Sequence, residues 1–226
     1  MSEYQVLSRK YRPKKLDDVI GQGFSVRAIS NAFSSNKLAH AFIFTGIRGV
    51  GKTTIARIIA MGLNCKKEGK PTSNPCGTCL NCNQILEDRY EDVLEIDAAS
   101  HTGVDDMREI ISSLKYMPSK GSYKVYIIDE VHMLSNSAFN ALLKTIEEPP
   151  SFVKFIFCTT ELQKIPITIV SRCQKYDLNR VSLEEISKFL IKITNLEGIR
   201  ITKEAINILS RLSEGSIRDS LTILDQ

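Results

Sequence analysis

The sequence predicts an α/β fold in which a parallel β-sheet is flanked by helices and followed by a small all-helical domain. Between residues 41 and 178, short apolar runs alternate with stretches of helical periodicity, a pattern typical of a parallel sheet with helices on its faces. After residue 178 the strand-like runs end, and helical patterns alone remain. We therefore expect an α/β domain over residues 1–178 and a helical domain over residues 179–226.

Five short segments are predicted as strands, and three of them are buried apolar runs. The run at 125–128 is too apolar to have a solvent-exposed face, as parallel strands buried on both sides usually are. The predicted strands span residues 41–44, 92–96, 125–128, 153–158 and 173–178.

Helices are predicted where apolar residues recur every three or four positions next to a capping residue. Ser182 begins a capping box at the start of a helix in the second domain. In the first domain, Pro149 ends the helix that begins at Ser135. One predicted helix covers residues 53–62. Four others are predicted to begin at Ser135, at Ser182, at Thr202 and after Gly215. The last helix reaches residue 226 without a stop signal, so we expect further chain beyond it.

Composition excludes several classes of protein. Hydrophobic residues make up 42% of the 226 residues, which is enough for a packed core. The longest apolar run is too short to span a membrane, and the start of the chain lacks the pattern of a secretory signal. We therefore expect a cytoplasmic protein. The net charge is only +4, and lysine and arginine are spread along the chain, which disfavours a dedicated nucleic-acid-binding module.

A glycine-rich loop matches the phosphate-binding pattern GxxxxGK[ST]. It follows a predicted strand and opens a predicted helix, which is the context that this motif requires. Backbone N–H groups and the helix N-terminus favour phosphate oxygens there. Lys52 is predicted to contact the β- and γ-phosphates of ATP, and Thr53 to bind Mg²⁺. The predicted binding residues are Gly46, Ile47, Arg48, Gly49, Val50, Gly51, Lys52, Thr53 and Thr54.

Two acidic residues follow the predicted strand at 125–128. Asp129 is predicted to be the second protein ligand of Mg²⁺, and Glu130 the base that polarises the attacking water. Both roles require the strand to lie next to the strand that precedes the phosphate-binding loop. We therefore expect the two strands to be neighbours in the sheet.

Four of the six cysteines lie close together in a stretch rich in turn-forming residues. Their spacing is Cys65-x₁₀-Cys76-x₂-Cys79-x₂-Cys82. In a reducing compartment such a cluster indicates metal ligands rather than disulfides, and four sulfurs fit a structural Zn²⁺ site. Cys158 and Cys173 lie in apolar surroundings and are interpreted as packing residues.

Several further segments resemble motifs of the AAA+ clamp-loader ATPases. The cysteine insertion narrows the resemblance to the γ/τ family of bacterial DNA polymerase III subunits, and the likeness covers nearly the whole chain. The segments are YRP at 11–13, VIGQ at 19–22, DEVHML at 129–134, AFNALLK at 138–144, EEPP at 147–150, SRC at 171–173 and GSIRD at 215–219.

The resemblance implies roles for residues that spacing alone does not explain. Arg218 of the helical lid is implied to reach the γ-phosphate in the same subunit, and Arg172 is implied to be an arginine finger acting in trans on the next subunit. Sensor 1 is implied to be Thr159, with Thr160 as the alternative. The residues implied to surround the adenine are Tyr11, Arg12, Val19 and Ile20.

Together the motifs imply an ATPase motor that loads a sliding clamp onto primed DNA as part of a hetero-oligomer with other clamp-loader subunits. The chain by itself is expected to be a monomer and a weak ATPase, because the family's collar lies beyond residue 226. A branch-migration helicase is disfavoured by the SRC motif and the cysteine insertion. A non-hydrolysing structural subunit is disfavoured by the intact Lys52, Thr53, Asp129 and Glu130.

Overall fold

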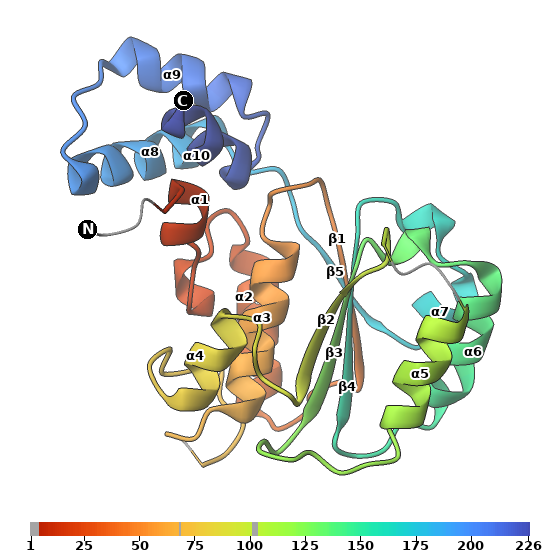
Figure 1. The fold of residues 1–226 in the computed structure, drawn as a ribbon. Helices are drawn as coiled ribbons and strands as arrows, with labels where there is room; N and C mark the ends of the chain where they lie inside the picture. Colours follow the sequence, from red (N-terminus) through yellow and green to blue (C-terminus); the bar gives the residue numbers. More distant parts are fainter. Residues whose placement is uncertain (1–4, 68, 101–103) are drawn as a thin grey trace.

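The computed structural model describes residues 5–67, 69–100 and 104–226 (Figure 1). The segment used above to exclude a secretory signal includes residues 1–4, which lie outside the described residues. The described strands form one five-stranded parallel sheet in the order β2-β3-β4-β1-β5, flanked by helices on both faces. The predicted α/β fold is confirmed.

All five predicted strands are present, with ends that differ by one residue at most. The phosphate-binding loop follows β1, and Asp129 ends β3. The expectation that these two strands are neighbours is wrong, because β4 lies between them. Crossover connections set the strand order in such sheets, and a linear pattern does not reveal it. The strands are β1 Ala41–Thr45, β2 Val93–Asp97, β3 Lys124–Asp129, β4 Val153–Thr159 and β5 Gln174–Asp177.

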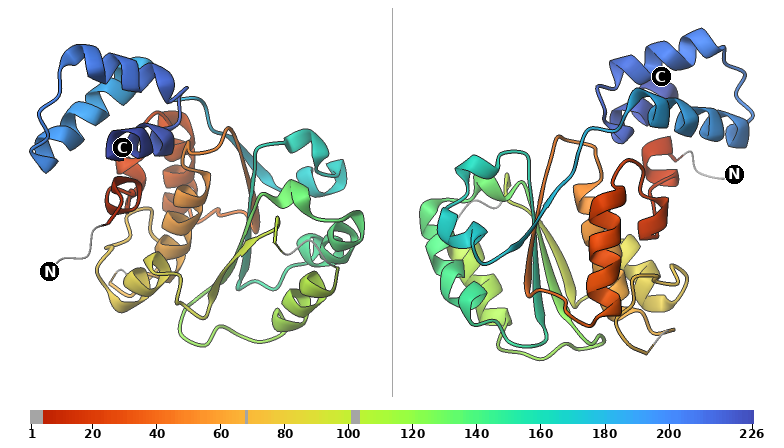
Figure 2. Two further views of the ribbon diagram at one scale, coloured as in Figure 1. Left: turned by 45° about the horizontal axis from the view of Figure 1, so that its top comes forward. Right: turned by 180° about the vertical axis from the view of Figure 1, so that it is seen from behind.

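Helices cover the two faces of the sheet and enclose two apolar cores. Figures 1 and 2 show α2, α3 and α4 on one face and α5, α6 and α7 on the other. Phe42 and Phe44 of β1 pack into the first core, while Phe155 and Phe157 of β4 pack into the second. The helices are α2 Gly23–Ser34, α3 Lys52–Asn64, α4 Leu80–Leu86, α5 Val104–Ser113, α6 Asn136–Glu147 and α7 Ile167–Val170.

Short 3₁₀ turns complete the α/β part of the chain. Two of them follow β3 and β4 and therefore lie at the end of the sheet where the predicted site residues gather. The turns are η1 Leu16–Asp18, η2 Val131–Met133 and η3 Leu162–Lys164.

Three helices after β5 form a small lid with its own apolar core. They are α8 Leu183–Glu197, α9 Lys203–Leu212 and α10 Ile217–Asp225. The predicted caps Ser182 and Thr202 are confirmed, and Ser182 forms the reciprocal capping box with Glu185. Figure 2 shows the lid at one end of the sheet. No helix in the described part of the chain is long and apolar enough to cross a membrane.

The start of the described chain packs with this lid rather than with the sheet. Helix α1 (Leu7–Lys10) places Leu7 in the apolar core of the lid, and the Leu7 backbone N–H donates to Asp225 Oδ2 at 2.8 Å. The two ends of the described chain are therefore joined across the lid.

Candidate nucleotide and metal sites

The predicted phosphate-binding loop connects β1 to α3 and has an open backbone. Gly46, Gly49 and Gly51 have φ values of 147°, 78° and 110°, which residues with a side chain rarely adopt. Gly51 is the N-cap of α3, so the first turn of that helix directs its free N–H groups toward the loop. The backbone therefore has the shape that binds phosphate oxygens.

The lid lies directly against this loop. The Arg218 backbone N–H donates to the Gly49 carbonyl at 3.2 Å. A Cβ added to Gly49 would lie 2.1 Å from Ser216 Oγ and 2.9 Å from Arg218 Cβ, so only glycine fits there. This contact places the first turn of α10, and with it Arg218, beside the phosphate-binding loop.

Two predicted Mg²⁺ ligands, Thr53 at the start of α3 and Asp129 at the end of β3, lie together although β1 and β3 are not adjacent. Thr53 Oγ1 donates to Asp129 Oδ2 at 2.8 Å. The buried Lys52 ammonium donates to the carbonyls of Gly46 and Ile47 at 2.9 and 3.1 Å. Hydroxyl and carboxylate oxygens are ligands that Mg²⁺ prefers, so the residues present fit Mg²⁺ with a nucleotide phosphate.

Glu130 follows Asp129 in an unusual backbone conformation. Its φ of 46° lies in the left-handed region, and its backbone N–H donates to Asp129 Oδ1 at 3.0 Å. Non-glycine residues held this way often lie at functional sites. Its carboxylate accepts a hydrogen bond from Thr160 Oγ1 at 3.2 Å.

The two candidates for sensor 1 have different surroundings. The buried Thr159 directs its hydroxyl at His132 Nδ1, 3.0 Å away, and accepts the Glu161 backbone N–H. Thr160 is exposed and directs its hydroxyl at Glu130. The geometry therefore favours Thr160 as the hydroxyl that faces the site.

Arg172 lies between α7 and the edge strand β5. The SRC motif follows α7 and directly precedes β5. The Arg172 guanidinium forms an ion pair with Glu147 Oε1 at 2.5 Å and donates to the Thr168 carbonyl at 2.6 Å. These partners belong to α6 and α7 rather than to the phosphate-binding loop.

The four residues assigned to the adenine lie along the junction of lid and loop. Val19 Cγ1 is 3.8 Å from the position of a Cβ on Gly51. Tyr11 and Ile20 pack against the lid core, and the Tyr11 hydroxyl donates to Glu197. Burial lowers the pKa of Arg12, and the charge of Arg57 lowers it further.

The four clustered cysteines converge at the C-terminal end of α3. Their sulfur atoms all lie within 4.8 Å of one another, and Cys76 Sγ is 4.0 Å from Cys82 Sγ. Tetrahedral zinc with Zn–S bonds near 2.3 Å requires sulfurs about 3.8 Å apart. The Thr78 backbone N–H lowers the pKa of Cys76 to about 6, whereas burial raises that of Cys82. The donor set therefore fits a metal ion.

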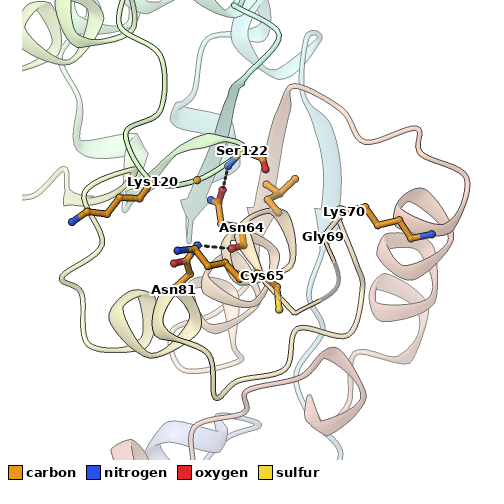
Figure 3. Close-up of a pocket in the computed structure, with 10 residues that line it drawn as sticks. Asn64, Cys65, Gly69, Lys70, Asn81, Lys120 and Ser122 are labelled. Atoms are coloured by element: carbon orange, nitrogen blue, oxygen red, sulfur yellow. Dashed lines mark hydrogen bonds between the residues drawn. The ribbon is translucent and has the colours of Figure 1, made fainter.

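Two buried asparagines anchor this cysteine cluster to the body of the domain (Figure 3). Asn81 Nδ2 donates to the Asn64 carbonyl at 2.9 Å, and Asn64 Oδ1 accepts the backbone N–H groups of Ser122 and Tyr123 at 3.0 Å. They line a pocket of about 190 Å³. The stretch was predicted as loop-rich, but Cys82 lies in α4.

Comparisons with known proteins cover nearly the whole chain. Residues 21–182 match the family described as "DNA polymerase III, delta subunit", and residues 185–226 match "DNA polymerase III clamp loader subunit, ATPase lid domain". The chain belongs to the DNA polymerase III clamp-loader family.

Relatives in this clamp-loader family are about 50% identical to the chain over the aligned residues. DNA polymerase III subunit tau of Escherichia coli K12 is 50% identical over 99% of this chain and 34% of its own length. The gamma subunit of Buchnera aphidicola subsp. Baizongia pistaciae is 49% identical over 99% of this chain and 60% of its own length. The chain therefore spans about a third of the tau relative.

Solved structures support the fold. The RuvB Holliday junction branch migration motor of Thermotoga maritima aligns with a TM-score of 0.67 at 23% identity, covering 94% of this chain and 63% of that one. A single-substitution variant of the same motor gives a TM-score of 0.68 at 22% identity, with the same coverage. At this identity the likeness shows a shared fold alone.

Proposed function

We propose that this chain is an ATPase motor of the bacterial replicative clamp loader, which binds and hydrolyses Mg·ATP to load a sliding clamp onto primed DNA. The observation that carries the proposal is the hydrogen bond between Thr53 and Asp129, at 2.8 Å. It joins the phosphate-binding loop to the acidic pair across an intervening strand. Membership of the clamp-loader family supplies the biological setting.

Each residue at this end of the sheet has a proposed task. Lys52 neutralises the β- and γ-phosphates, while Thr53 and Asp129 hold Mg²⁺, which supplies charge neutralisation for phosphoryl transfer when bound. Glu130 takes a proton from the attacking water. Arg218 adds charge from the lid, and we assign the sensor hydroxyl to Thr160, because it faces Glu130.

We propose that residues 1–178 form the nucleotide-binding domain and residues 179–226 the lid. The contact between Gly49 and Arg218 couples the two, so that a bound nucleotide would bias the position of the lid. Tyr11, Arg12, Val19 and Ile20 would surround the base at this junction. Arg172 would act in trans on a neighbouring subunit.

We propose that the cysteine cluster holds a structural Zn²⁺. All four positions of a tetrahedral ion would be filled by sulfur, so the ion would have no open position for catalysis. The other partners proposed are further clamp-loader subunits, the clamp and primed DNA, in the cytoplasm.

The decisive experiment measures ATP hydrolysis by the purified chain alone and by a loader that is assembled from the full-length protein, the other loader subunits, clamp and primed DNA. We expect slow hydrolysis alone and a marked increase in the assembly. If hydrolysis stays absent in the complete assembly, the proposed function is wrong. A basal rate that the assembly does not change would support an ATPase but contradict the clamp-loader role.

A further inference from the structure

His132 occupies a central position that the proposed function leaves without a task. Its side chain is only 7% exposed. Nδ1 lies 3.0 Å from Thr159 Oγ1 and 3.5 Å from Glu130 Oε2, and Nε2 lies 3.4 Å from Glu161 Oε1. One buried ring therefore contacts residues at the ends of both β3 and β4.

The β4 side of this arrangement is rigid. Thr159 is fully buried, and its hydroxyl accepts the Glu161 backbone N–H at 3.0 Å. A hydroxyl has one proton and two acceptor positions, so one acceptor position and the proton remain for His132 Nδ1. The backbone of the turn after β4 thereby fixes the position of the ring.

The Glu130 side is less constrained. Within the described residues, the Glu130 carboxylate has Thr160 and His132 as its side-chain contacts, both at Oε2. Thr160 is exposed, whereas the His132 side chain is only 7% exposed. A distance of 3.5 Å is longer than a strong hydrogen bond, and such contacts often tighten when substrate binds.

We propose that His132 is a positioning residue that holds the Glu130 carboxylate in the orientation needed to activate water. The proposal rests on the proposed function, in which Glu130 is the general base. A general base must lie within about 2.6–3.2 Å of the proton that it removes. A ring that is 7% exposed and anchored to β4 limits the rotation of a carboxylate at the end of β3.

Three substitutions of His132 test this proposal by separating its two ring nitrogens. His132→Asn retains a polar atom near Nδ1, which faces Thr159 and Glu130. His132→Gln retains one near Nε2, which faces Glu161 instead, and His132→Ala removes both. Each variant is measured for nucleotide affinity, by titration with an ATP analogue, and for single-turnover ATP hydrolysis in the assembled loader.

We expect His132→Ala and His132→Gln to hydrolyse ATP about 10- to 100-fold more slowly, the effect of a misplacement of about 1 Å. His132→Asn should recover most of the wild-type rate, and affinity should be unchanged in all three. If Asn is as slow as Ala, if Ala matches wild type, or if affinity falls in parallel with rate, the positioning role is wrong. If His132→Ala fails to fold, the hydrolysis rates of His132→Asn and His132→Gln are compared instead. Equal rates in these two variants would contradict the positioning role.

Glu130→Gln separates this proposal from the proposed function. If that variant hydrolyses ATP as fast as wild type, Glu130 is not the base, and both the catalytic assignment and the role of His132 fail. If Glu130→Gln is inactive while His132→Ala is fully active, only the positioning role fails.

Discussion

Lys52 illustrates, at the scale of a single residue, how a buried charge serves a ligand. Its ammonium is held inside the loop by two carbonyls, within reach of the space that the glycines leave open. We expect Lys52→Ala to weaken ATP binding by at least about 10- to 100-fold, the value of one charged hydrogen bond. Equilibrium titration with a fluorescent ATP analogue measures this loss.

Lys154 offers a matched control for that substitution. It is also buried and also donates to two backbone carbonyls, those of Leu38 and Ala39, but it lies at the opposite end of the sheet. Lys154→Ala should reduce stability without changing nucleotide affinity. Equal loss of affinity in both variants would indicate a general structural effect and remove Lys52 from the site.

Glu130 should affect chemistry rather than binding, because it follows the proposed Mg²⁺ ligand Asp129 and is not itself a predicted ligand. Replacing it by Gln preserves shape and removes the basic oxygen. We expect Glu130→Gln to bind ATP normally and to hydrolyse it about 10²- to 10⁴-fold more slowly. Rapid-quench measurement of a single turnover tests this, and a normal rate would exclude Glu130 as the base.

At the scale of elements, the contact between the phosphate-binding loop and α10 has almost no spare room. A methyl group on Gly49 would overlap Ser216 Oγ and crowd Arg218. We expect Gly49→Ala to displace the lid and to weaken nucleotide binding, at a cost of about 1–3 kcal/mol for the backbone alone. Thermal melting with and without ATP measures both effects.

Gly198 provides the control, because its φ of 68° is also positive while nothing lies within 4 Å of an added Cβ. Gly198→Ala therefore carries the backbone cost without the clash. If both variants lose the same stability and the same response to ATP, the contact between loop and lid has no special role.

The cysteine cluster should behave as a local element, since Asn64 and Asn81 tie it to a domain with cores of its own. We predict about one tightly bound Zn²⁺ per chain, with an apparent binding energy of roughly 10–16 kcal/mol by analogy with small zinc peptides. Chelation should raise hydrogen exchange in residues 65–82 and leave the sheet protected. The measurement is the zinc content of protein purified without added zinc. A zinc content near zero per chain would contradict the proposed Zn²⁺ site.

At the scale of the whole molecule, Arg172 is proposed to act on the nucleotide of a neighbouring subunit. Its partners in the described structure are on α6 and α7, and the arginine lies beside an edge strand. We expect Arg172→Ala to bind ATP normally and to slow hydrolysis in the neighbouring subunit on the order of 10³-fold. Mixed assemblies, with the variant in one position and hydrolysis counted per site, decide this. Loss at the variant's own site would show that the arginine acts within its own chain.

The sequence by itself determined the fold class, the strands and the loop. Short segments bounded by turns predicted all five strands to within one residue. The signal is clearest for β1 and β4, because a strand buried on both faces has a continuous apolar sequence. The glycines of the loop were predictable for a similar reason, since each holds a backbone conformation that other residues avoid. Helix α2 was missed, although Val26, Ile29 and Phe33 carry a helical period.

Only the tertiary structure decided which of these residues meet. Insertion of β4 between β1 and β3 is a long-range choice of packing, and it places Thr159 against His132 while Thr160 faces Glu130. Two adjacent threonines have the same local pattern, and the alternation of side chains at a strand end directs them to opposite sides. The pairing of α1 with the lid joins distant parts of the chain. Such contacts depend on how the helices and strands pack against one another, and the local spacing of residues in the sequence does not predict that packing.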